Sequence, residues 1–210
     1  MAVTAAEFQA LPQTAYSVAR PDLRTGDILL FHSIGLGSLA TEYFTNSLWS
    51  HAAFIWCIPD VQRVLLLESM DKIGVRVMPM STRINGNAAS PIPFPGKLLV
   101  ARSDQFPVTP ARDKLTAMTQ FALDRIGFPY SNQELREIAL RLAEGDLGAA
   151  PGGRLDPKNQ FICSEYVAKC YDAMGIQLAP DREGFIAPGD IANDPSVHAL
   201  YSLCPDTPER

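Results

Sequence analysis

The sequence has few histidines and cysteines, and it lacks long runs of apolar residues or of one charge. Its 210 residues include 3 histidines and 4 cysteines, so a mechanism that needs an imidazole or a thiol has few candidates. No stretch approaches the roughly 18 apolar residues of a membrane-spanning helix. The net charge of −5 argues against a nucleic-acid-binding protein, and no basic tract is present to dock on anionic lipid.

The start of the chain also lacks the basic and apolar segments of a secretory signal. The cysteines lack a CxxC pair and zinc-ribbon spacing. We therefore expect a cytoplasmic protein with unpaired cysteines, although a chain whose signal had been removed would look the same. The length and the 47% hydrophobic and 20% charged residues predict one globular domain over residues 1–210, with a peripheral segment at 1–24.

Strands are predicted first along the chain and helices afterwards. Turn signals and apolar patterning predict five strands, at 27–31, 51–56, 63–68, 74–80 and 98–102, followed by three helices, at 109–126, 131–142 and from Cys163 to Gly175. Thr109 and Pro110 are the expected N-cap and first residue of the first helix. Loops are expected at 84–96 and 144–159. This order predicts an α+β domain with an antiparallel sheet.

His51 and Glu68 are expected to face each other across two neighbouring strands. If the turn at 59–62 closes a simple hairpin, Ala53 lies opposite Glu68 and Ile55 opposite Leu66. His51 and Glu68 are then diagonal neighbours on one face, within side-chain reach. A carboxylate in that position can fix the imidazole tautomer and leave the other ring nitrogen as a base.

Cys163 is the best candidate nucleophile. It lies in the first turn of a predicted helix, directly after a long loop. Unpaired N–H groups and the positive end of the helix dipole favour a thiolate there. The same N–H groups, including that of Cys163 itself, could hold the oxyanion of a tetrahedral intermediate.

Each of these residues also has a purely structural interpretation. A cysteine on an apolar stripe is usually a small buried hydrophobe, and we interpret Cys57 and Cys170 in this way and Cys204 as a bystander. His32 and His198 are expected to be structural or surface residues. A carboxylate such as Glu68 is most often solvated. A metal site built from His51, Glu68 and Cys163 is a minor alternative, because no ligand pair has helical or knuckle spacing.

The order of the motifs resembles a known group of enzymes. Residues 26–31, 50–55 and 66–69 resemble the core of NlpC-type cell-wall peptidases, in which the nucleophilic cysteine precedes these strands. Here the Cys163-Ser164 helix follows them, as in circularly permuted papain-like families. These motifs resemble those of the bacterial YiiX/YebB-like group, which is related to lecithin retinol acyltransferase. Further similar segments are 74–77, 127–130, 162–167 and 188–191.

The resemblance implies a papain-like, circularly permuted NlpC-type domain whose small antiparallel sheet packs against helices. It implies Cys163 as nucleophile, His51 as base and Glu68 as the orienting residue, and it places Tyr130 at the site. Ser50 and Ser164, which flank the reactive pair, are further candidate substrate-binding residues. The expected activity is a cysteine peptidase or amidase, or an acyl transfer, without metal or cofactor.

The expected substrate is a small peptide, a peptidoglycan-like peptide or a lipid acyl compound, and neither a nucleic-acid partner nor an integral membrane segment is expected. A non-catalytic binding module that retains the fold is the alternative from another class. A zinc-dependent hydrolase is a second alternative.

Overall fold

The computed structural model describes residues 5–32, 48–87, 92–131, 161–178 and 186–206. These residues form a seven-stranded sheet and six α-helices, which confirms the predicted mixed α+β class. The strand order is β1-β7-β6-β2-β3-β4-β5. Every neighbouring pair is antiparallel except β1 and β7, which are parallel.

The elements have the following bounds. The strands are β1 (Gln13–Ala15), β2 (Ile28–His32), β3 (His51–Ile58), β4 (Arg63–Met70), β5 (Gly74–Pro79), β6 (Lys97–Ser103) and β7 (Val197–Cys204). The helices are α1 (Ala5–Ala10), α2 (Tyr16–Ala19), α4 (Met80–Asn85), α5 (Arg112–Leu123), α7 (Cys163–Ala173) and α8 (Pro188–Asn193). Two short 3-10 turns, η1 (Arg20–Asp22) and η2 (Pro59–Val61), complete the set.

Several predicted elements are confirmed. The five predicted strands correspond to β2 to β6, and the predicted pairing of Ile55 with Leu66 is present. The predicted third helix is α7, which begins at Cys163. Gly175 follows it with a positive φ of 80°, a conformation that favours glycine after a helix. The predicted helix at 131–142 lies almost wholly, and the loop at 144–159 wholly, outside the described residues.

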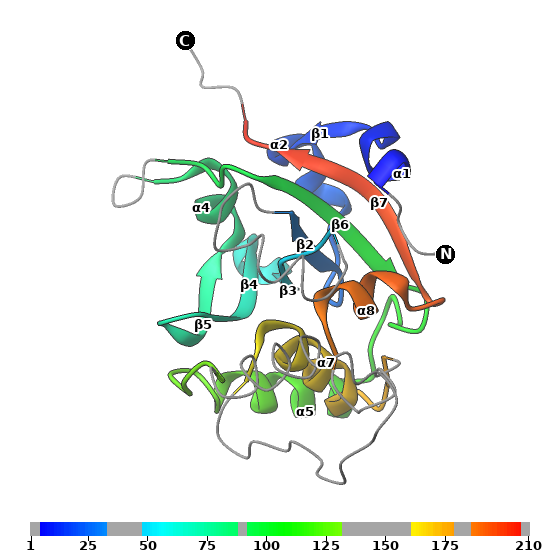
Figure 1. Ribbon diagram of the computed structural model, residues 1–210. Coiled ribbons are helices and arrows are strands. Elements are labelled where there is room, and N and C mark those ends of the chain that lie inside the picture. Colours follow the sequence, from blue (N-terminus) through cyan, green and yellow to red (C-terminus); the bar gives the residue numbers. More distant parts are fainter. Residues whose placement is uncertain (1–4, 33–47, 88–91, 132–160, 179–185, 207–210) are drawn as a thin grey trace, which may run out of the picture.

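Other predictions were wrong in detail. The first predicted helix begins at Arg112, after the extended residue Ala111, and not at Pro110. Its first hydrogen bond, from the N–H of Leu115 to the carbonyl of Ala111, fixes this later start. The predicted loop at 84–96 begins inside α4. The N-terminal segment contributes β1, which forms the edge of the sheet beside β7, a strand that was not predicted (Figure 1).

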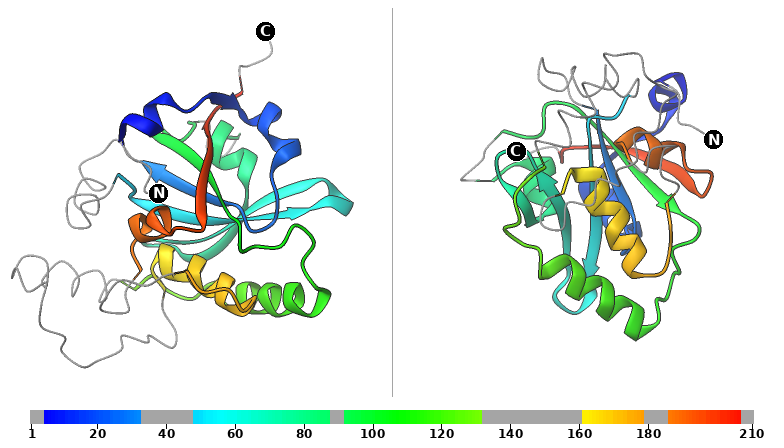
Figure 2. Two further views of the ribbon diagram at one scale, coloured as in Figure 1. Left: turned by 90° about the vertical axis from the view of Figure 1, so that its right-hand side faces the viewer. Right: turned by 60° about the horizontal axis from the view of Figure 1, so that its bottom comes forward.

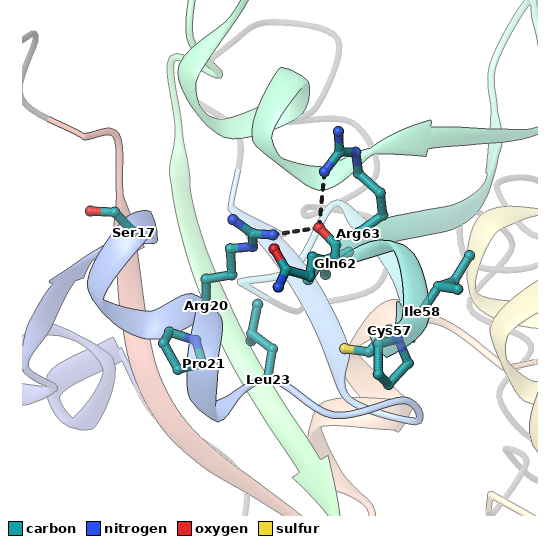
Figure 3. A pocket seen from close by; sticks show the side chains of 10 residues that line it. Ser17, Arg20, Pro21, Leu23, Cys57, Ile58, Gln62 and Arg63 are labelled. Carbon is teal, nitrogen blue, oxygen red and sulfur yellow. Dashed lines mark hydrogen bonds between the residues drawn. The ribbon is translucent and has the colours of Figure 1, made fainter.

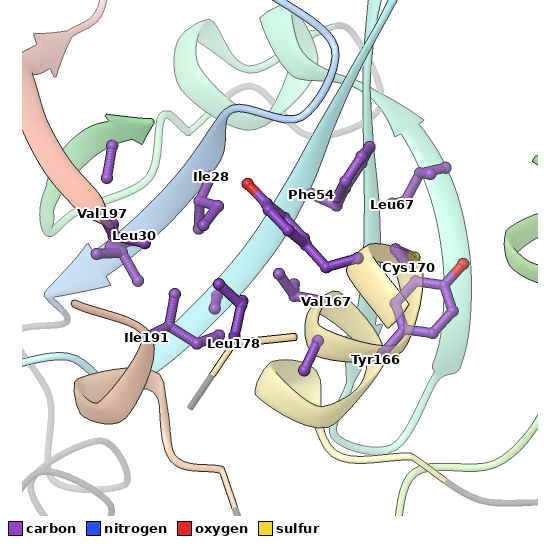
Figure 4. Close-up of a cluster of buried hydrophobic side chains, with 14 of the residues drawn as sticks. Ile28, Leu30, Phe54, Leu67, Tyr166, Val167, Cys170, Leu178, Ile191 and Val197 are labelled. Atoms are coloured by element: carbon purple, nitrogen blue, oxygen red, sulfur yellow. The ribbon is translucent and has the colours of Figure 1, made fainter. Parts of the chain in front are cut away.

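The sheet is covered on both faces. Helix α7 packs on β3 and β4, and α5 packs on α7, on the same side of the sheet (Figures 1 and 2). Figure 4 shows this core, in which Val167 and Cys170 of α7 lie close to Phe54 and Leu67 of the sheet. Strands buried on both faces have few polar positions, which explains why β2 and β3 are almost continuously apolar.

The opposite face carries a second core. Leu29, Ala53 and Leu66 point to that side and are covered by residues of α2 and α4, among them Tyr16 and Ile84. The alternation of side chains along β3 therefore places Ala53 and Ile55 on the α4 side and Ala52 and Phe54 on the α7 side.

Candidate active site

The structure joins His51 and Glu68 by a direct hydrogen bond. His51 is the first residue of β3, and its Nε2 lies 2.8 Å from Oε2 of Glu68 on β4. The carboxylate can only accept, so Nε2 is the donor and Nδ1 remains for a second partner. Glu68 is fully buried, and the diagonal geometry expected from the hairpin is confirmed.

Cys163 is that second partner. It is the first residue of α7 and is almost completely buried, and its thiol is close enough to His51 for the two groups to shift each other's pKa. The backbone N–H groups of Ala52 and Ser164 also lie near its sulfur and lower the pKa of the thiol. The three residues predicted to form the site are thus connected in the order Cys163, His51, Glu68, and their catalytic role stays a prediction.

The two reactive residues come from opposite faces of the sheet and meet where two strands separate. The pairing of β3 with β4 runs from Ile58↔Arg63 to Phe54↔Leu67 and stops before His51. Beyond this point the N–H of Ala52 can donate to Cys163 instead of to a neighbouring strand. The first residue of α7 therefore lies next to His51 at the end of β3 where the pairing with β4 has stopped.

Buried hydrogen bonds hold the start of α7 in this position. The Oγ of Ser69, on β4, donates to the carbonyl of Phe161 at 2.7 Å. The Oγ of Ser164 donates to the carbonyl of Ile186 at 2.6 Å. Deeper in the helix, the hydroxyl of Tyr166 donates to the carbonyl of Ala122 at 2.9 Å. These contacts tie α7 to the sheet, to the segment before α8, and to α5.

The electrostatics favour a charged pair. Burial alone would raise the pKa of the Cys163 thiol, but His51 and the two backbone N–H groups lower it below its ordinary value. Burial alone would lower the pKa of His51, but Cys163 and Glu68 raise it to about 9. Both shifts favour a thiolate and an imidazolium at neutral pH.

Glu68 is kept ionised by two arginines that the sequence analysis did not assign to the site. Arg76, opposite Glu68 on β5, donates from Nε and Nη2 to Oε1 at 2.8 and 2.6 Å. Burial alone would raise the pKa of Glu68, but His51, Arg76 and Arg83 lower it to about 2. Arg76 could have been found from the register of the turn at 71–73, whereas Arg83 lies on the helix that was not predicted.

The three predicted substrate-binding residues have different environments. Tyr130 is half-buried and its backbone pairs with Phe161, two residues before Cys163. Ser50 donates its hydroxyl to the carbonyl of Phe31 at 3.1 Å, next to His51. The hydroxyl of Ser164 is fully buried on Ile186, so its backbone N–H, which lies near the sulfur of Cys163, is the group that faces the site.

The turn at 127–130, which begins at Gly127 and ends at Tyr130, is fixed against β5. Gly74 has a positive φ of 86°, and a Cβ there would lie 2.1 Å from the carbonyl oxygen of Phe128. That carbonyl accepts the N–H of Val75 at 2.8 Å, and the N–H of Gly127 donates back to Val75. The close approach of these backbones requires glycine at position 74 and places Tyr130 beside Phe161.

The other cysteines differ from Cys163. Cys170, two turns further along α7, is fully buried, and burial raises the pKa of its thiol far above the ordinary range. Burial also raises the pKa of Cys57 to about 11. His32 lies 2.8 Å from the carbonyl of Leu48, and His198 is exposed beside Asp104. These environments agree with the structural interpretation of the four residues.

A pocket lies at the other end of β3, away from His51. It has a volume of about 460 Å³, and its lining includes Cys57, Arg20 and Arg63 (Figure 3). Both arginines donate to the carbonyl of Gln62. None of the predicted site residues lines it.

Comparisons with known proteins identify the fold. A scan against known protein families and a search of curated proteins find no match. The chain is similar in structure to the crystal structure of the metalloprotein yiiX from Escherichia coli O157:H7, with 17% identity and a TM-score of 0.58 over 87% of this chain and 98% of that one. The chain therefore has a YiiX-like fold. No helix in the described ranges has the length and apolar character needed to cross a bilayer.

Proposed function

We propose that this protein is a cysteine-dependent hydrolase or acyltransferase of the circularly permuted papain-like type, acting on an amide or ester bond. The observation that supports this proposal best is the connected arrangement in which Glu68 holds Nε2 of His51 at 2.8 Å and the other side of the ring meets Cys163. A buried carboxylate, an oriented imidazole and a thiol at a helix start form the set of groups that thiol enzymes use.

In the proposed mechanism, the thiolate of Cys163 attacks the substrate carbonyl and a C–S bond forms. In this proposal, N–H groups at the start of α7, including that of Cys163 itself, stabilise the oxyanion. His51, as imidazolium, gives its proton to the leaving amine or alcohol as the acyl-enzyme forms. His51 then accepts a proton from water or from an acceptor amine or alcohol, which attacks the thioester and frees Cys163.

The name of the yiiX structure raises metal binding as a second candidate function. Within the described residues, no group of three or more His, Cys, Asp or Glu side chains could hold a metal ion. At the candidate site, Oε1 of Glu68 already accepts from Arg76 and Oε2 accepts from His51. The donors left for a metal at this site are Nδ1 of His51 and the sulfur of Cys163, which are fewer than the three or four protein ligands of a zinc site.

A non-catalytic binding module is the other alternative, and selective alkylation separates it from an enzyme. We expect iodoacetamide near neutral pH to label Cys163 rapidly, because its thiol has a lowered pKa, and to label Cys57 and Cys170 slowly. Mass spectrometry of the peptides gives the rate for each cysteine. In His51→Ala the Cys163 rate should fall on the order of 100-fold.

Two outcomes would contradict the proposal. One is slow and uniform labelling of all four cysteines, and the other is rapid Cys163 labelling that persists in His51→Ala. Cys163→Ala, in which the labelled peptide should stay unmodified, is the control for assignment. The zinc alternative requires bound metal by elemental analysis and a loss of activity with chelator.

A further inference from the structure

Arg83 carries a guanidinium close to the candidate site, and its Nε has no acceptor among the described residues. It lies on α4, and its Cζ is 5.1 Å from the ring centroid of Phe31 and 4.9 Å from that of Phe94. The two rings determine where the guanidinium lies but offer no hydrogen-bond acceptor. Among the described residues, no group accepts a hydrogen bond from its buried Nε. Such a group in a folded protein calls for an explanation.

The nearest carboxylate is already engaged. Glu68 accepts two hydrogen bonds from Arg76 on Oε1 and one from His51 on Oε2. With a thiolate on Cys163 and an imidazolium on His51, this group of five residues carries two negative and three positive charges. Within the described ranges, the charge of this group without a hydrogen-bonded partner of opposite sign is that of Arg83.

Arg83 is also close enough to act on a bound substrate. The ring of Phe31 neighbours both Arg83 and His51, with 4.8 Å from the Phe31 centroid to that of His51. Together with the 5.1 Å to Arg83, this keeps the guanidinium within about 10 Å of the imidazole. A group attached a few bonds from a carbonyl at Cys163 can span this distance.

We infer that Arg83 binds a carboxylate of the substrate, so that the acyl substrate is an acid whose carboxylate lies a few bonds from the reactive carbonyl. The inference rests on the proposed function, and it narrows the substrate to one chemical class. A guanidinium whose Nε–H lacks an acceptor can bind a carboxylate through charge-assisted hydrogen bonds. A neutral amide in the same place would leave the excess positive charge unpaired.

The test uses matched alkylating probes with and without a carboxylate. N-bromoacetyl derivatives of glycine, β-alanine and 4-aminobutyrate, each as the free acid and as the carboxamide, place the charge at three distances. In every case the Cys163 thiolate forms a C–S bond to the methylene carbon and bromide leaves. We expect at least one acid to label Cys163 about tenfold faster than its amide, as a charge-assisted hydrogen bond would allow.

Three variants assign that preference to Arg83. In Arg83→Gln the acid-to-amide rate ratio should fall to about that of the free thiol, and in Arg83→Lys a part of it should remain. Arg125→Gln is the matched control, because Arg125 also stacks on an aromatic ring, Phe121, and also has a buried Nε without an acceptor among the described residues. It should keep the wild-type ratio.

The results separate the inference from the proposed function. Rapid, His51-dependent labelling of Cys163 with equal rates for all acids and amides would overturn the carboxylate inference and leave the enzyme proposal standing. An acid preference that is unchanged in Arg83→Gln would also overturn it. Slow labelling that does not depend on His51 would overturn both. The first comparison needs only the wild-type protein, so a variant that fails to fold leaves the inference testable.

Discussion

The described part of the chain contains two buried carboxylate–guanidinium pairs that look alike and differ in one contact. Asp27, directly before β2, pairs with Arg102 on β6, and Glu68 on β4 pairs with Arg76 on β5. Both carboxylates are almost fully buried. Each guanidinium makes two hydrogen bonds of 2.6 to 2.8 Å to its carboxylate.

The difference lies in the second oxygen. Both oxygens of Asp27 accept from Arg102, and Oδ2 also accepts the backbone N–H of Arg24 at 2.8 Å. In Glu68 only Oε1 faces the arginine, and Oε2 accepts from His51. The Asp27 carboxylate therefore contacts only an arginine side chain and a backbone N–H in these hydrogen bonds. The Glu68 carboxylate also contacts the imidazole of His51, which in turn lies beside the thiol of Cys163. The partner of each oxygen, more than the burial of the pair, distinguishes a candidate site from a structural ion pair.

The largest expected effect on the reactivity of Cys163 comes from neutralising Glu68, with Asp27 as the comparison. Glu68→Gln removes a charge that raises the pKa of His51, so the imidazolium and the thiolate of Cys163 are both less stable. The rate of iodoacetamide labelling at Cys163 should fall on the order of 100-fold at neutral pH. Its midpoint in a rate-against-pH profile should move upward, towards that of an ordinary thiol.

Asp27→Asn is the matched control for this change. It also places an amide beside a buried guanidinium, so we expect a comparable loss of stability in chemical denaturation. The labelling rate of folded Cys163 and its midpoint pH should stay at the wild-type values. A similar fall in both variants would show that Glu68 acts through general stability and not through His51.

A smaller effect on reactivity is expected from the arginines. Arg76→Met leaves Glu68 buried without its cation, and it should lower the labelling rate at Cys163 about tenfold and the free energy of unfolding by about 3 kcal/mol. Arg102→Met should cost a similar free energy of unfolding without slowing the labelling. If both variants slowed the labelling of Cys163 equally, the effect of Arg76 would come from a general loss of stability and not from its contact with Glu68.

The pH dependence of stability gives a second measurement for Arg76. Glu68 has a pKa of about 2 in the folded protein, against an ordinary value of 4.5. It therefore stabilises the fold above pH 4.5, and this contribution is lost as the pH falls towards 2. Arg76→Met should reduce that contribution, so the stability difference from wild type should be largest near neutral pH and should shrink on acidification.

The part of the site that could be predicted from sequence is the part set by local geometry. The short turn at 59–62 fixed the register between β3 and β4, and hence the contact between His51 and Glu68. The start of a helix at Cys163 followed from the apolar stripe and the preceding loop. Both depend on residues that are neighbours in sequence or across one hairpin.

The rest depends on long-range contacts. Cys163 and His51 are separated by more than a hundred residues, and their proximity was expected only from the resemblance to permuted papain-like enzymes. Strand β7 pairs with β6 and β1, which are distant in sequence. Arg83 lies near the site because α4 packs on β4 and β5. No local pattern in the sequence specifies these packing relations.

The smallest expected effect separates two buried serines, one beside each carboxylate pair. Ser69 follows Glu68 and donates to the carbonyl of Phe161 at 2.7 Å, which holds the segment leading to Cys163. Ser103 follows Arg102 and shares a hydrogen bond of 3.1 Å with Ser196. Replacing either by alanine removes one buried hydrogen bond, while the Phe161 carbonyl keeps the N–H of Ser131 and the Ser196 hydroxyl keeps Asp194. Both variants should therefore lose about 0.5 to 1.5 kcal/mol of unfolding free energy.

Only Ser69→Ala should also slow the labelling of Cys163, by about two- to threefold, because a small displacement of the start of α7 weakens the contact of the thiol with His51. Ser69→Thr, which keeps the hydroxyl, should recover part of that rate. Equal labelling in Ser69→Ala, Ser103→Ala and wild type would mean that the N–H groups of Ala52 and Ser164 position Cys163 without help from Phe161. Ser69 would then contribute to the stability of the fold but not to the reactivity of Cys163.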